Sequence, residues 1–467
     1  MSQKNSNLLE RFLQFNAEHK LFSAGQKICI ALSGGIDSVV LFDLFIKIRQ
    51  KLDLEICAAH LNHQLRGEEA DSDQVFVESL CSSQNVPCFV DKKDVRTYGR
   101  ERKMSTEEAA REVRYAFLKE TARRTDSHLI ALAHNANDQA ETFLDHLTRG
   151  AGLAGLSGME PVREDFIRPL LFATRKDIEL YARQNGLAFR IDSTNTDVSY
   201  KRNRIRHELL PLLEKYNPRI ISSLNKTAAI LGNADVFMQN QAKEAYNSCL
   251  IAKDAEKIIL DIESYLLYFP ALQRYILAHS LKELSQDERL IDFDLVERIN
   301  TLIKKRAAGK KVPLTEQVAV TVAASELVVG CFRQGSEEII LDPVEGLHEL
   351  WDGWILEINS ESKPLEQMLL NGSESDASVD ADLIHQPVKV RTWRRGDRFQ
   401  PINFAGSKKL SDFFIDLKVP FYLKKRIPIL ECPSGIVWVA GYRLDNRFKV
   451  TAKTKNILRC ELRKNAG

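Results

Sequence analysis

The sequence predicts an α/β fold, with a doubly wound parallel sheet in the N-terminal domain followed by two smaller α+β domains. Two observations support the sheet: short apolar, β-branched segments recur between about residues 25 and 195, and helix-like segments follow most of them. This alternation is typical of parallel strands covered by helices on both faces. The third observation is length, because 467 residues exceed what one compact core usually holds.

Four segments of the first region are predicted to be buried strands, at residues 27–32, 55–61, 87–91 and 128–133. Polar segments lie at the ends of three of them, at residues 33–38, 60–66 and 134–141. In a doubly wound sheet, ligands bind beyond the carboxyl ends of the strands. We therefore expect these three polar segments to meet in one crevice.

The later part of the chain divides by pattern and composition. Residues 210–250 and 266–284 are helix-like, residues 257–262 are strand-like, and residues 317–331 suit a hairpin. Residues 359–382 are rich in Ser, Glu and Asp, which favours a linker. We expect a sheet domain at 1–215, a mixed, largely helical middle domain at 216–358, a linker at 359–384 and a final domain at 385–467.

Composition is that of an ordinary globular protein, with 44% hydrophobic and 28% charged residues. No apolar run reaches membrane-spanning length, and the polar first residues do not resemble a secretory signal. The eight cysteines form no C-x-x-C pair, so neither a zinc knuckle nor an iron–sulfur site is indicated. We therefore expect the cysteines to be reduced thiols in a cytosolic protein.

Charge is unevenly distributed along the chain, although the net charge is only +2. From His385 to the end there are 19 Lys and Arg against 6 Asp and Glu, which leaves the rest of the chain acidic. One basic module on an acidic body is typical of a protein that binds a polyanion, and RNA or DNA fits better than a membrane surface. On charge alone, a solvated basic surface explains the imbalance equally well.

The segment S-G-G-I-D-S at residues 33–38 is the most informative in the chain, because it lies between a predicted strand and a predicted helix. Two glycines allow the backbone to approach a phosphate, and the helix start offers unpaired N–H groups. Asp37 suits a Mg²⁺ ion between itself and the anion. The segment is similar to the pyrophosphate loop of enzymes that split ATP between its α and β phosphates. The candidate residues are Ser33, Gly34, Gly35, Ile36, Asp37 and Ser38.

Two further motifs are candidates for contacts with ATP. His60, Asn62, His63 and Arg66 lie at the end of the second strand, where adenine, ribose or phosphates could bind, although a lone histidine is more often structural. The second motif begins a helix at residue 106, for which Ser105 is the expected N-cap.

In that helix Glu107 and Arg111 have the spacing of an ion pair, and Arg114 lies about one turn further along. A surface salt bridge worth roughly a few tenths of a kcal/mol is the simpler explanation of this spacing. In the functional interpretation Arg111 and Arg114 face phosphates while Glu107 holds their geometry.

A third motif, at residues 134–142, opens a helix that carries Asp138, Glu141 and Asp145 on one face. Three like charges on one face repel each other, so they do not stabilise the helix by themselves. They suit a cation, either Mg²⁺ or an amine substrate. Asn137 or Asp138 capping the helix is the alternative, and it leaves Glu141 unexplained.

Basic residues are concentrated in three more places. Arg149 begins a glycine-dense segment, and four Lys and Arg lie within residues 201–206, which suits a nucleic-acid backbone entering the site. In the final domain, residues 406–409 resemble a phosphate-binding turn before a helix. The candidate nucleic-acid contacts are Arg202, Asn203 and Arg206 near the site, and Arg394, Arg395, Arg398, Lys408 and Lys409 in the final domain.

Taken in this order, the motifs resemble the tRNA(Ile)-lysidine synthetase family of the PP-loop ATP pyrophosphatase superfamily, over nearly the whole chain. The motifs that carry the resemblance are S-G-G-I-D-S, H-L-N-H-Q-L-R-G, E-E-A-A-R-E-V-R-Y, A-H-N-A-N-D-Q-A-E-T, R-G-A-G-L-A-G-L, R-N-R-I-R-H, R-R-G-D-R-F-Q-P and G-S-K-K-L-S-D-F-F. The loop alone would support only the superfamily, whereas the whole set supports the family.

The resemblance implies a two-step reaction on the CAU-anticodon isoleucine tRNA. ATP adenylates O2 of the wobble cytidine, and the ε-amine of free L-lysine then displaces AMP at C2, giving lysidine, AMP and pyrophosphate and changing codon reading from AUG to AUA. It implies ATP and Mg²⁺ as cofactors, a cytoplasmic location and tRNA contacts from the middle and final domains, and it allows a homodimer.

The resemblance also implies roles for the candidate residues. The implied catalytic residues are Asp37, Asp138, Glu141, Arg111 and Arg114; the implied ATP ligands are residues 33–38 with His60; and the implied lysine and cytidine contacts are Asp138, Glu141, Glu107, Arg149, Arg202, Asn203 and Arg206.

One motif departs from the family pattern H-H-x-D-D-Q, because this chain has His134, Asn135, Asn137 and Asp138 there. Asn135 removes a titratable ring and Asn137 removes a charge. We therefore expect Asp138 and Glu141 to act, and no carboxylate role at position 137.

Two other functions compete. A tRNA thiolase of the same superfamily would usually need paired cysteines near the site, which the spacing of Cys29, Cys57, Cys81 and Cys88 does not offer. A non-catalytic RNA-binding protein with a degenerate nucleotide fold would not need intact motif residues. Release of AMP that depends on both lysine and tRNA would separate these possibilities.

Overall fold

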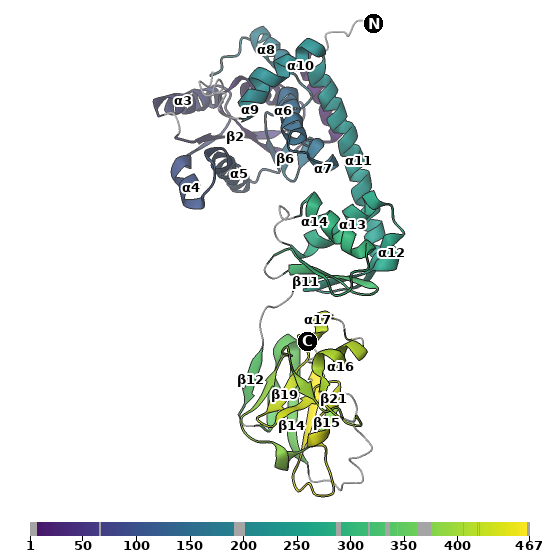
Figure 1. Ribbon diagram of the computed structural model, residues 1–467. Helices are drawn as coiled ribbons and strands as arrows, with labels where there is room; N and C mark the ends of the chain where they lie inside the picture. Colours follow the sequence, from purple (N-terminus) through teal and green to yellow (C-terminus); the bar gives the residue numbers. More distant parts are fainter. Residues whose placement is uncertain are drawn as a thin grey trace. The chain divides into compact units, whose positions relative to one another are not determined.

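The computed structural model describes residues 7–64, 67–190, 201–285, 291–315, 318–331, 337–342, 344–361, 375–404, 406–417, 419 and 421–464. The chain folds into two compact units, Met1–Phe237 and Met238–Gly467, which contain the elements labelled in Figure 1. None of the described helices combines the length and apolarity that crossing a membrane requires.

The first unit is built on a six-stranded sheet with the order β3-β2-β1-β4-β6-β5. All neighbours pair in parallel except the antiparallel edge pair β5–β6. The prediction of a doubly wound parallel sheet is therefore confirmed. The strands are β1 Lys27–Ala31, β2 Glu55–Asn62, β3 Cys88–Lys92, β4 Leu129–Ala131, β5 Val162–Arg163 and β6 Phe166–Ile167.

Helices cover both faces of this sheet, and each face has its own apolar core. Helices α1, α2, α3 and α8 pack on one face around Phe12, Phe45 and Val77, whereas α5 packs on the other face around Leu118 and Ile130. The helices of this unit are α1 Leu8–His19, α2 Ile36–Arg49, α3 Glu68–Ser83, α4 Val95–Arg102, α5 Thr106–Arg124, α6 Ala136–Leu147, α7 Leu153–Leu156, α8 Arg175–Gln184, α9 Lys201–Arg204, a π-helical turn Ile205–Leu209 and α10 Leu210–Tyr216.

The long helix α11, Ile220–Cys249, passes from the first unit into the second. It leads to a five-stranded antiparallel sheet with the order β7-β8-β11-β10-β9, in which β10 and β11 form the predicted hairpin. Three helices pack on this sheet around Ile276 and Ile299. The elements are β7 Leu250–Lys253, β8 Lys257–Asp261, α12 Ile262–Leu266, α13 Pro270–Leu284, α14 Phe293–Lys304, β9 Lys311–Pro313, β10 Val318–Val322 and β11 Glu326–Cys331.

The last part of the chain contains two antiparallel sheets, ordered β12-β16-β19-β20-β21 and β13-β14-β22-β15, and a short pair β17–β18. The two larger sheets share one apolar core around Trp438 and Ile358. The elements are β12 Glu338–Leu341, β13 Gly346–Glu349, β14 Trp354–Glu361, β15 Asp376–Asp380, β16 Val388–Arg391, β17 Arg398–Phe399, β18 Lys408–Lys409, α16 Leu410–Asp416, α17 Phe421–Lys424, β19 Ile429–Cys432, β20 Gly435–Val439, β21 Arg443–Leu444 and β22 Ile457–Lys464.

These pairings differ from the domain boundaries that we expected. Strand β12 pairs with β16, and β14 pairs along its whole length with β22, so residues 338–361 belong with the final sheets rather than with a middle domain at 216–358. Of the expected linker at 359–384, residues 359–361 and 376–380 are strand residues, and residues 362–374 lie outside the described part of the chain. We therefore place the start of the final module near Glu338.

Candidate active site

The S-G-G-I-D-S segment forms the turn between β1 and α2. Gly34 has φ +88°, a conformation that favours glycine, and a Cβ atom there would make a tight contact of 3.3 Å with Val77 Cγ2. Ser38 Oγ donates to the Gly35 carbonyl at 2.8 Å, lies 3.1 Å from Ser33 Oγ and accepts from the Ser33 N–H at 3.2 Å. Gly35 is the N-cap of α2 and supplies no side-chain cap, so the first turn presents its N–H groups to an anion.

A cavity of about 470 Å³ opens beside this loop. That volume lies in the range of pockets that hold a nucleotide-sized ligand. The walls come from the carboxyl ends of β1, β2 and β4 and from α3 and α5, and they include Ser33, Asp37, Ser38, His60, His63, Arg114 and His134. Residues from the three polar segments that we expected to meet in one crevice thus lie around one cavity. Leu65 and Arg66 lie outside the described residues.

Several buried nitrogen atoms in the cavity wall have no protein partner among the described residues. His60 donates from Nδ1 to the Leu32 carbonyl at 2.9 Å, which leaves its Nε2 as an acceptor without a partner. Arg114 Nε, which can only donate, and His134 Nδ1 also have no protein partner among the described residues. Burial lowers the pKa of His60, and it lowers the pKa of His134 to about 3, so both rings are neutral near pH 7. A ligand that satisfies these atoms gains specific contacts.

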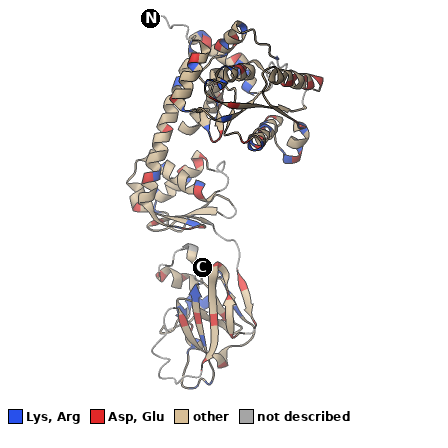
Figure 2. Cartoon of the chain, turned by 180° about the vertical axis from the view of Figure 1, so that it is seen from behind, with Lys and Arg blue, Asp and Glu red and all other residues tan. Residues whose placement is uncertain are grey.

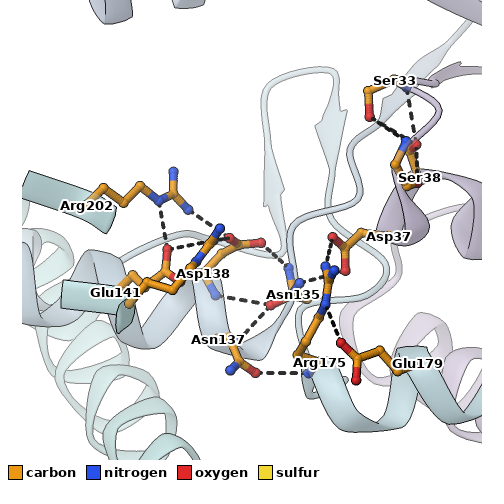
Figure 3. Close-up of polar contacts among 12 residues, drawn as sticks. Ser33, Asp37, Ser38, Asn135, Asn137, Asp138, Glu141, Arg175, Glu179 and Arg202 are labelled. Atoms are coloured by element: carbon orange, nitrogen blue, oxygen red, sulfur yellow. Dashed lines mark hydrogen bonds and ion pairs between the residues drawn. The ribbon is translucent and has the colours of Figure 1, made fainter. Parts of the chain in front are cut away.

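Asp37 accepts hydrogen bonds from two different elements. Arg175 Nη1, from the first turn of α8, lies 2.5 Å from Asp37 Oδ2, and Asn135 Nδ2 donates to Asp37 Oδ1 at 3.0 Å (Figure 3). Burial raises the pKa of Asp37, although the guanidinium of Arg175 opposes this effect. Arg175 also pairs with Glu179 at 3.0 Å. Sequence reasoning missed Arg175, and the one local signal was the capping box between Thr174 and Asp177 that starts its helix.

Asn135 is the N-cap of α6, whereas the alternative considered from the sequence was a cap at Asn137 or Asp138. Its Oδ1 accepts from the N–H groups of Asn137 and Asp138 at 2.9 and 3.1 Å, and Asp138 Oδ2 accepts from the Asn135 N–H at 2.9 Å. Asn137 Oδ1 accepts from the Arg175 N–H at 3.0 Å. Both asparagines that depart from the family pattern therefore make specific contacts, and together they connect α6 to Asp37 and to α8 (Figure 3).

Asp138 and Glu141 face cations, as we expected from two like charges on one helix face. In the structure these cations are two arginines of the chain itself. Arg202 contacts Asp138 Oδ1 at 2.9 Å and Glu141 Oε2 at 2.8 Å, and Arg206 contacts the same two carboxylates at 3.2 and 2.6 Å. The Glu141 side chain is only 1% exposed. Burial disfavours the charged arginines, yet the two carboxylates hold the pKa of Arg202 and Arg206 above the ordinary value.

The other expected site residues lie around this centre. Asp145, one turn beyond Glu141, pairs with Arg149 at 2.8 Å and with Lys201 at 2.7 Å. Asn203 lies on α9, between Arg202 and Arg206 in the sequence. Glu107 and Arg111 are exposed on α5, where the guanidinium of Arg111 lies 5.1 Å from the centre of the Tyr115 ring.

The basic residues expected to bind RNA in the final module have different surroundings. Arg394, Arg395, Arg398 and Lys409 are exposed, and Lys408 pairs with Asp416. Lys408 and Lys409 form strand β18, which pairs with β17. Figure 2 shows acidic positions among the basic ones in this module.

Arg391 is buried inside the final module, so the excess positive charge of this module is not all available to a partner. The side chain of Arg391 is 3% exposed and makes bidentate contacts with Asp397 and Glu431. Arg391 is thus part of the folded core of the module rather than of a binding surface.

Four cysteines of the first unit that form no C-x-x-C pair in the sequence lie as two neighbouring pairs in the structure. Cys29 and Cys57 face each other across β1 and β2, and the hydrogen bond to Cys57 together with burial raises the pKa of the Cys29 thiol. A hydrogen bond to Cys88, together with burial, likewise raises the pKa of the Cys81 thiol. All four are free thiols, and none of them is among the described residues that line the cavity.

Comparisons with known proteins match both ends of the chain. The family model of the PP-loop domain matches residues 4–213, and that of the TilS substrate C-terminal domain matches residues 388–461. The tRNA(Ile)-lysidine synthase of Geobacter sulfurreducens is 35% identical over 462 residues, which cover 96% of this chain and 95% of that protein. This chain belongs to the tRNA(Ile)-lysidine synthase family. A second tRNA(Ile)-lysidine synthase, from Dehalococcoides mccartyi, is 34% identical over 98% of this chain and 99% of its own length.

The place of these matches agrees with the geometry of the site. In this member of the tRNA(Ile)-lysidine synthase family, the PP-loop match contains the S-G-G-I-D-S turn and the described cavity, so the cavity lies in an ATP-binding type of domain. The C-terminal match contains the exposed basic residues of β17 and β18.

Proposed function

We propose that this protein joins free L-lysine to C2 of the wobble cytidine of the CAU-anticodon isoleucine tRNA and converts ATP to AMP and pyrophosphate. One observation carries the proposal beyond family membership. A continuous set of hydrogen bonds runs from Asp37 in the phosphate loop through Asn135 to Asp138, whose carboxylate shares Arg202 and Arg206 with Glu141. The phosphate loop beside the cavity and a pair of carboxylates suited to an amine are therefore connected through the first two turns of one helix.

In the first step, O2 of the cytidine attacks the α-phosphorus of ATP, and the bond from that phosphorus to the pyrophosphate breaks. The N–H groups at the start of α2 and the hydroxyl groups of Ser33 and Ser38 are placed to stabilise the charge that develops on the leaving pyrophosphate. His60 and His134 offer neutral ring nitrogens to the nucleoside part of ATP or to the cytidine.

Mg²⁺ fits the same place, because it binds through one or two carboxylates together with substrate phosphates. Asp37 would hold the ion through carboxylate oxygens that it would share with Arg175 and Asn135. When bound, Mg²⁺ neutralises phosphate charge.

In the second step, the ε-nitrogen of lysine forms a bond to C2 of the cytidine, and the C2–O2 bond breaks as AMP leaves with that oxygen. Asp138 and Glu141 attract the ammonium groups of lysine, and one of these carboxylates accepts the proton that the ε-nitrogen must lose. Lysine then competes with Arg202 and Arg206 for the carboxylates. A phosphate of the anticodon loop is a suitable alternative partner for the displaced guanidinium groups.

The tRNA supplies a cytidine that must be unstacked from the anticodon loop. We propose that Arg149, Arg202 and Arg206 contact the RNA near the cavity, while Arg394, Arg395, Arg398, Lys408 and Lys409 contact it through the final module. Association through basic side chains makes affinity depend on salt concentration. A cytoplasmic location, where tRNA, lysine and ATP occur together, and a homodimer both stay part of the proposal.

The direct experiment measures AMP and pyrophosphate release with the isoleucine CAU tRNA while lysine, tRNA or ATP is omitted in turn. Release that requires all three, with radiolabelled lysine bound to the tRNA, supports lysidine synthesis. Release with tRNA but without incorporation of lysine would favour a thiolase-like reaction. Binding of tRNA with no release at all would favour an RNA-binding protein without catalytic activity.

A further inference from the structure

A segment after α8 is attached directly to the phosphate loop. The N–H of Arg190 donates to the Gly34 carbonyl at 2.9 Å, and Arg190 forms a parallel β-bridge with Gly35. Its side chain passes close to the same glycine, since a Cβ atom on Gly34 would lie 3.7 Å from Arg190 Cγ. The backbone therefore holds Arg190 against the two glycines that would contact a phosphate.

Asp73 orients the guanidinium group of Arg190. Arg190 Nε donates to Asp73 Oδ1 at 2.9 Å, and Asp73 projects from α3 with a side chain that is 11% exposed. Both residues line the cavity beside the phosphate loop. The contact uses Nε and leaves Nη1 and Nη2 outside this ion pair, so the forked end of the guanidinium is available to a planar or tetrahedral anion.

The charge of a triphosphate favours a protein cation at this place, in addition to the N–H groups of α2 and a bound Mg²⁺. The S-G-G-I-D-S segment contains no basic residue, unlike the G-x-x-x-x-G-K-[ST] loop, whose lysine contacts the β and γ phosphates. Among the described residues that line the cavity, Arg114 and Arg190 carry guanidinium groups; Arg114 comes from α5, and Arg190 comes from the segment after α8. Of these two, Arg190 is the one bound to the loop itself.

We propose that Arg190 binds the β and γ phosphates of ATP, and the pyrophosphate that leaves, and that Asp73 is a positioning residue for its guanidinium. The proposal rests on the use of ATP and not on the identity of the second substrate. During the first step, Arg190 would supply positive charge where the leaving pyrophosphate gains negative charge.

The test compares two nucleotides on the full-length protein, without lysine or tRNA. Calorimetric titration measures affinity for α,β-methylene-ATP, which carries the β and γ phosphates, and for AMP, which lacks them. Arg190→Gln should weaken binding of α,β-methylene-ATP by about tenfold to a hundredfold, the range for a hydrogen bond to a charged group, and leave AMP binding unchanged. Arg183→Gln, on the exposed part of α8, is the matched control and should change neither affinity.

A purely structural ion pair would give a different result, in which both nucleotides lose affinity equally or neither does, and that result would overturn the proposal. If Arg190→Gln does not fold, Arg190→Lys carries the test, since it keeps the charge but loses the fork. It should show a smaller loss that is still confined to α,β-methylene-ATP.

The positioning role of Asp73 has its own test. Asp73→Asn should weaken α,β-methylene-ATP binding less than Arg190→Gln does, and the double variant should bind no more weakly than Arg190→Gln alone, because Asp73 acts through Arg190. Additive losses would contradict this role. Since no arm uses lysine or tRNA, failure of this proposal leaves lysidine synthesis untouched, and the reverse also holds.

Discussion

Asn135 and Asp37 are joined by a hydrogen bond of 3.0 Å between the side-chain amide of one and the carboxylate of the other, across 98 residues of sequence. The same Asn135 caps α6 through its Oδ1 atom. One side chain thus fixes the helix that carries Asp138 and Glu141 and also contacts the phosphate loop. The amide itself has no charge to gain or lose, so any pH dependence of this contact comes from the carboxylate of Asp37.

The two roles of Asn135 can be separated by substitution. Asn135→Ser keeps an N-cap oxygen but is too short to reach Asp37, so the free energy of unfolding should change little while kcat/KM for ATP falls about tenfold. Asn135→Ala should remove both the N-cap and the contact with Asp37, and the variant should be less stable by about 1 kcal/mol. Urea unfolding and AMP release measure these effects. Full activity of Asn135→Ser would show that the contact with Asp37 is not needed.

Glu141 is expected to contribute to lysine binding rather than to ATP binding. Glu141→Gln should raise KM for lysine by about tenfold to a hundredfold, because a charged hydrogen-bond acceptor is lost, and should leave KM for ATP unchanged. Asp145→Asn is the matched control on the same helix, since Asp145 pairs with Arg149 and Lys201 instead. Equal effects of the two substitutions on KM for lysine would contradict the assignment.

Burial of His134 makes stability depend on pH in a defined direction. Its pKa is about 3 in the folded protein against 6.5 ordinarily, so protonation is far more favourable in the unfolded chain. Stability is therefore complete well above pH 6.5 and declines as pH falls through that value. Between pH 7 and pH 5 this residue alone should cost about 2 kcal/mol. His134→Gln should reduce the loss measured by urea unfolding over that interval by a similar amount, and an unchanged loss would exclude this origin.

Two basic residues of the final module should behave differently because one is exposed and the other is buried. Lys409→Gln should reduce the slope of log K for tRNA against log salt by about one and leave unfolding unchanged. Arg391→Leu leaves Asp397 and Glu431 without their buried cation and should cost about 3–5 kcal/mol of stability. Titrations of tRNA binding at several salt concentrations measure the first effect, and urea unfolding measures the second. A stable Arg391→Leu variant with weakened tRNA binding would assign Arg391 to the RNA surface instead.

The amino-acid sequence by itself determined the sheet and the meeting of its strand ends. Periodic apolar segments, helix starts and two glycines in a turn are local properties, so they predict β1, β2 and β4, the N-cap of α5 at Ser105 and the phosphate loop. The rule that parallel strands bring their carboxyl ends to one edge then places His60 and His134 beside that loop.

Only the tertiary structure decided which charges meet. Arg175 with Asp37, Arg190 with Asp73 and Arg202 with Glu141 are separated by 138, 117 and 61 residues, and no periodic pattern relates side chains across such distances. Arg391 belongs to a basic segment by sequence and yet lies in a core, because the pairing of β16 with β19 brings Glu431 to it. Local pattern determines where a charged residue lies along an element, and the packing of distant elements determines whether it faces a ligand, a partner charge or water.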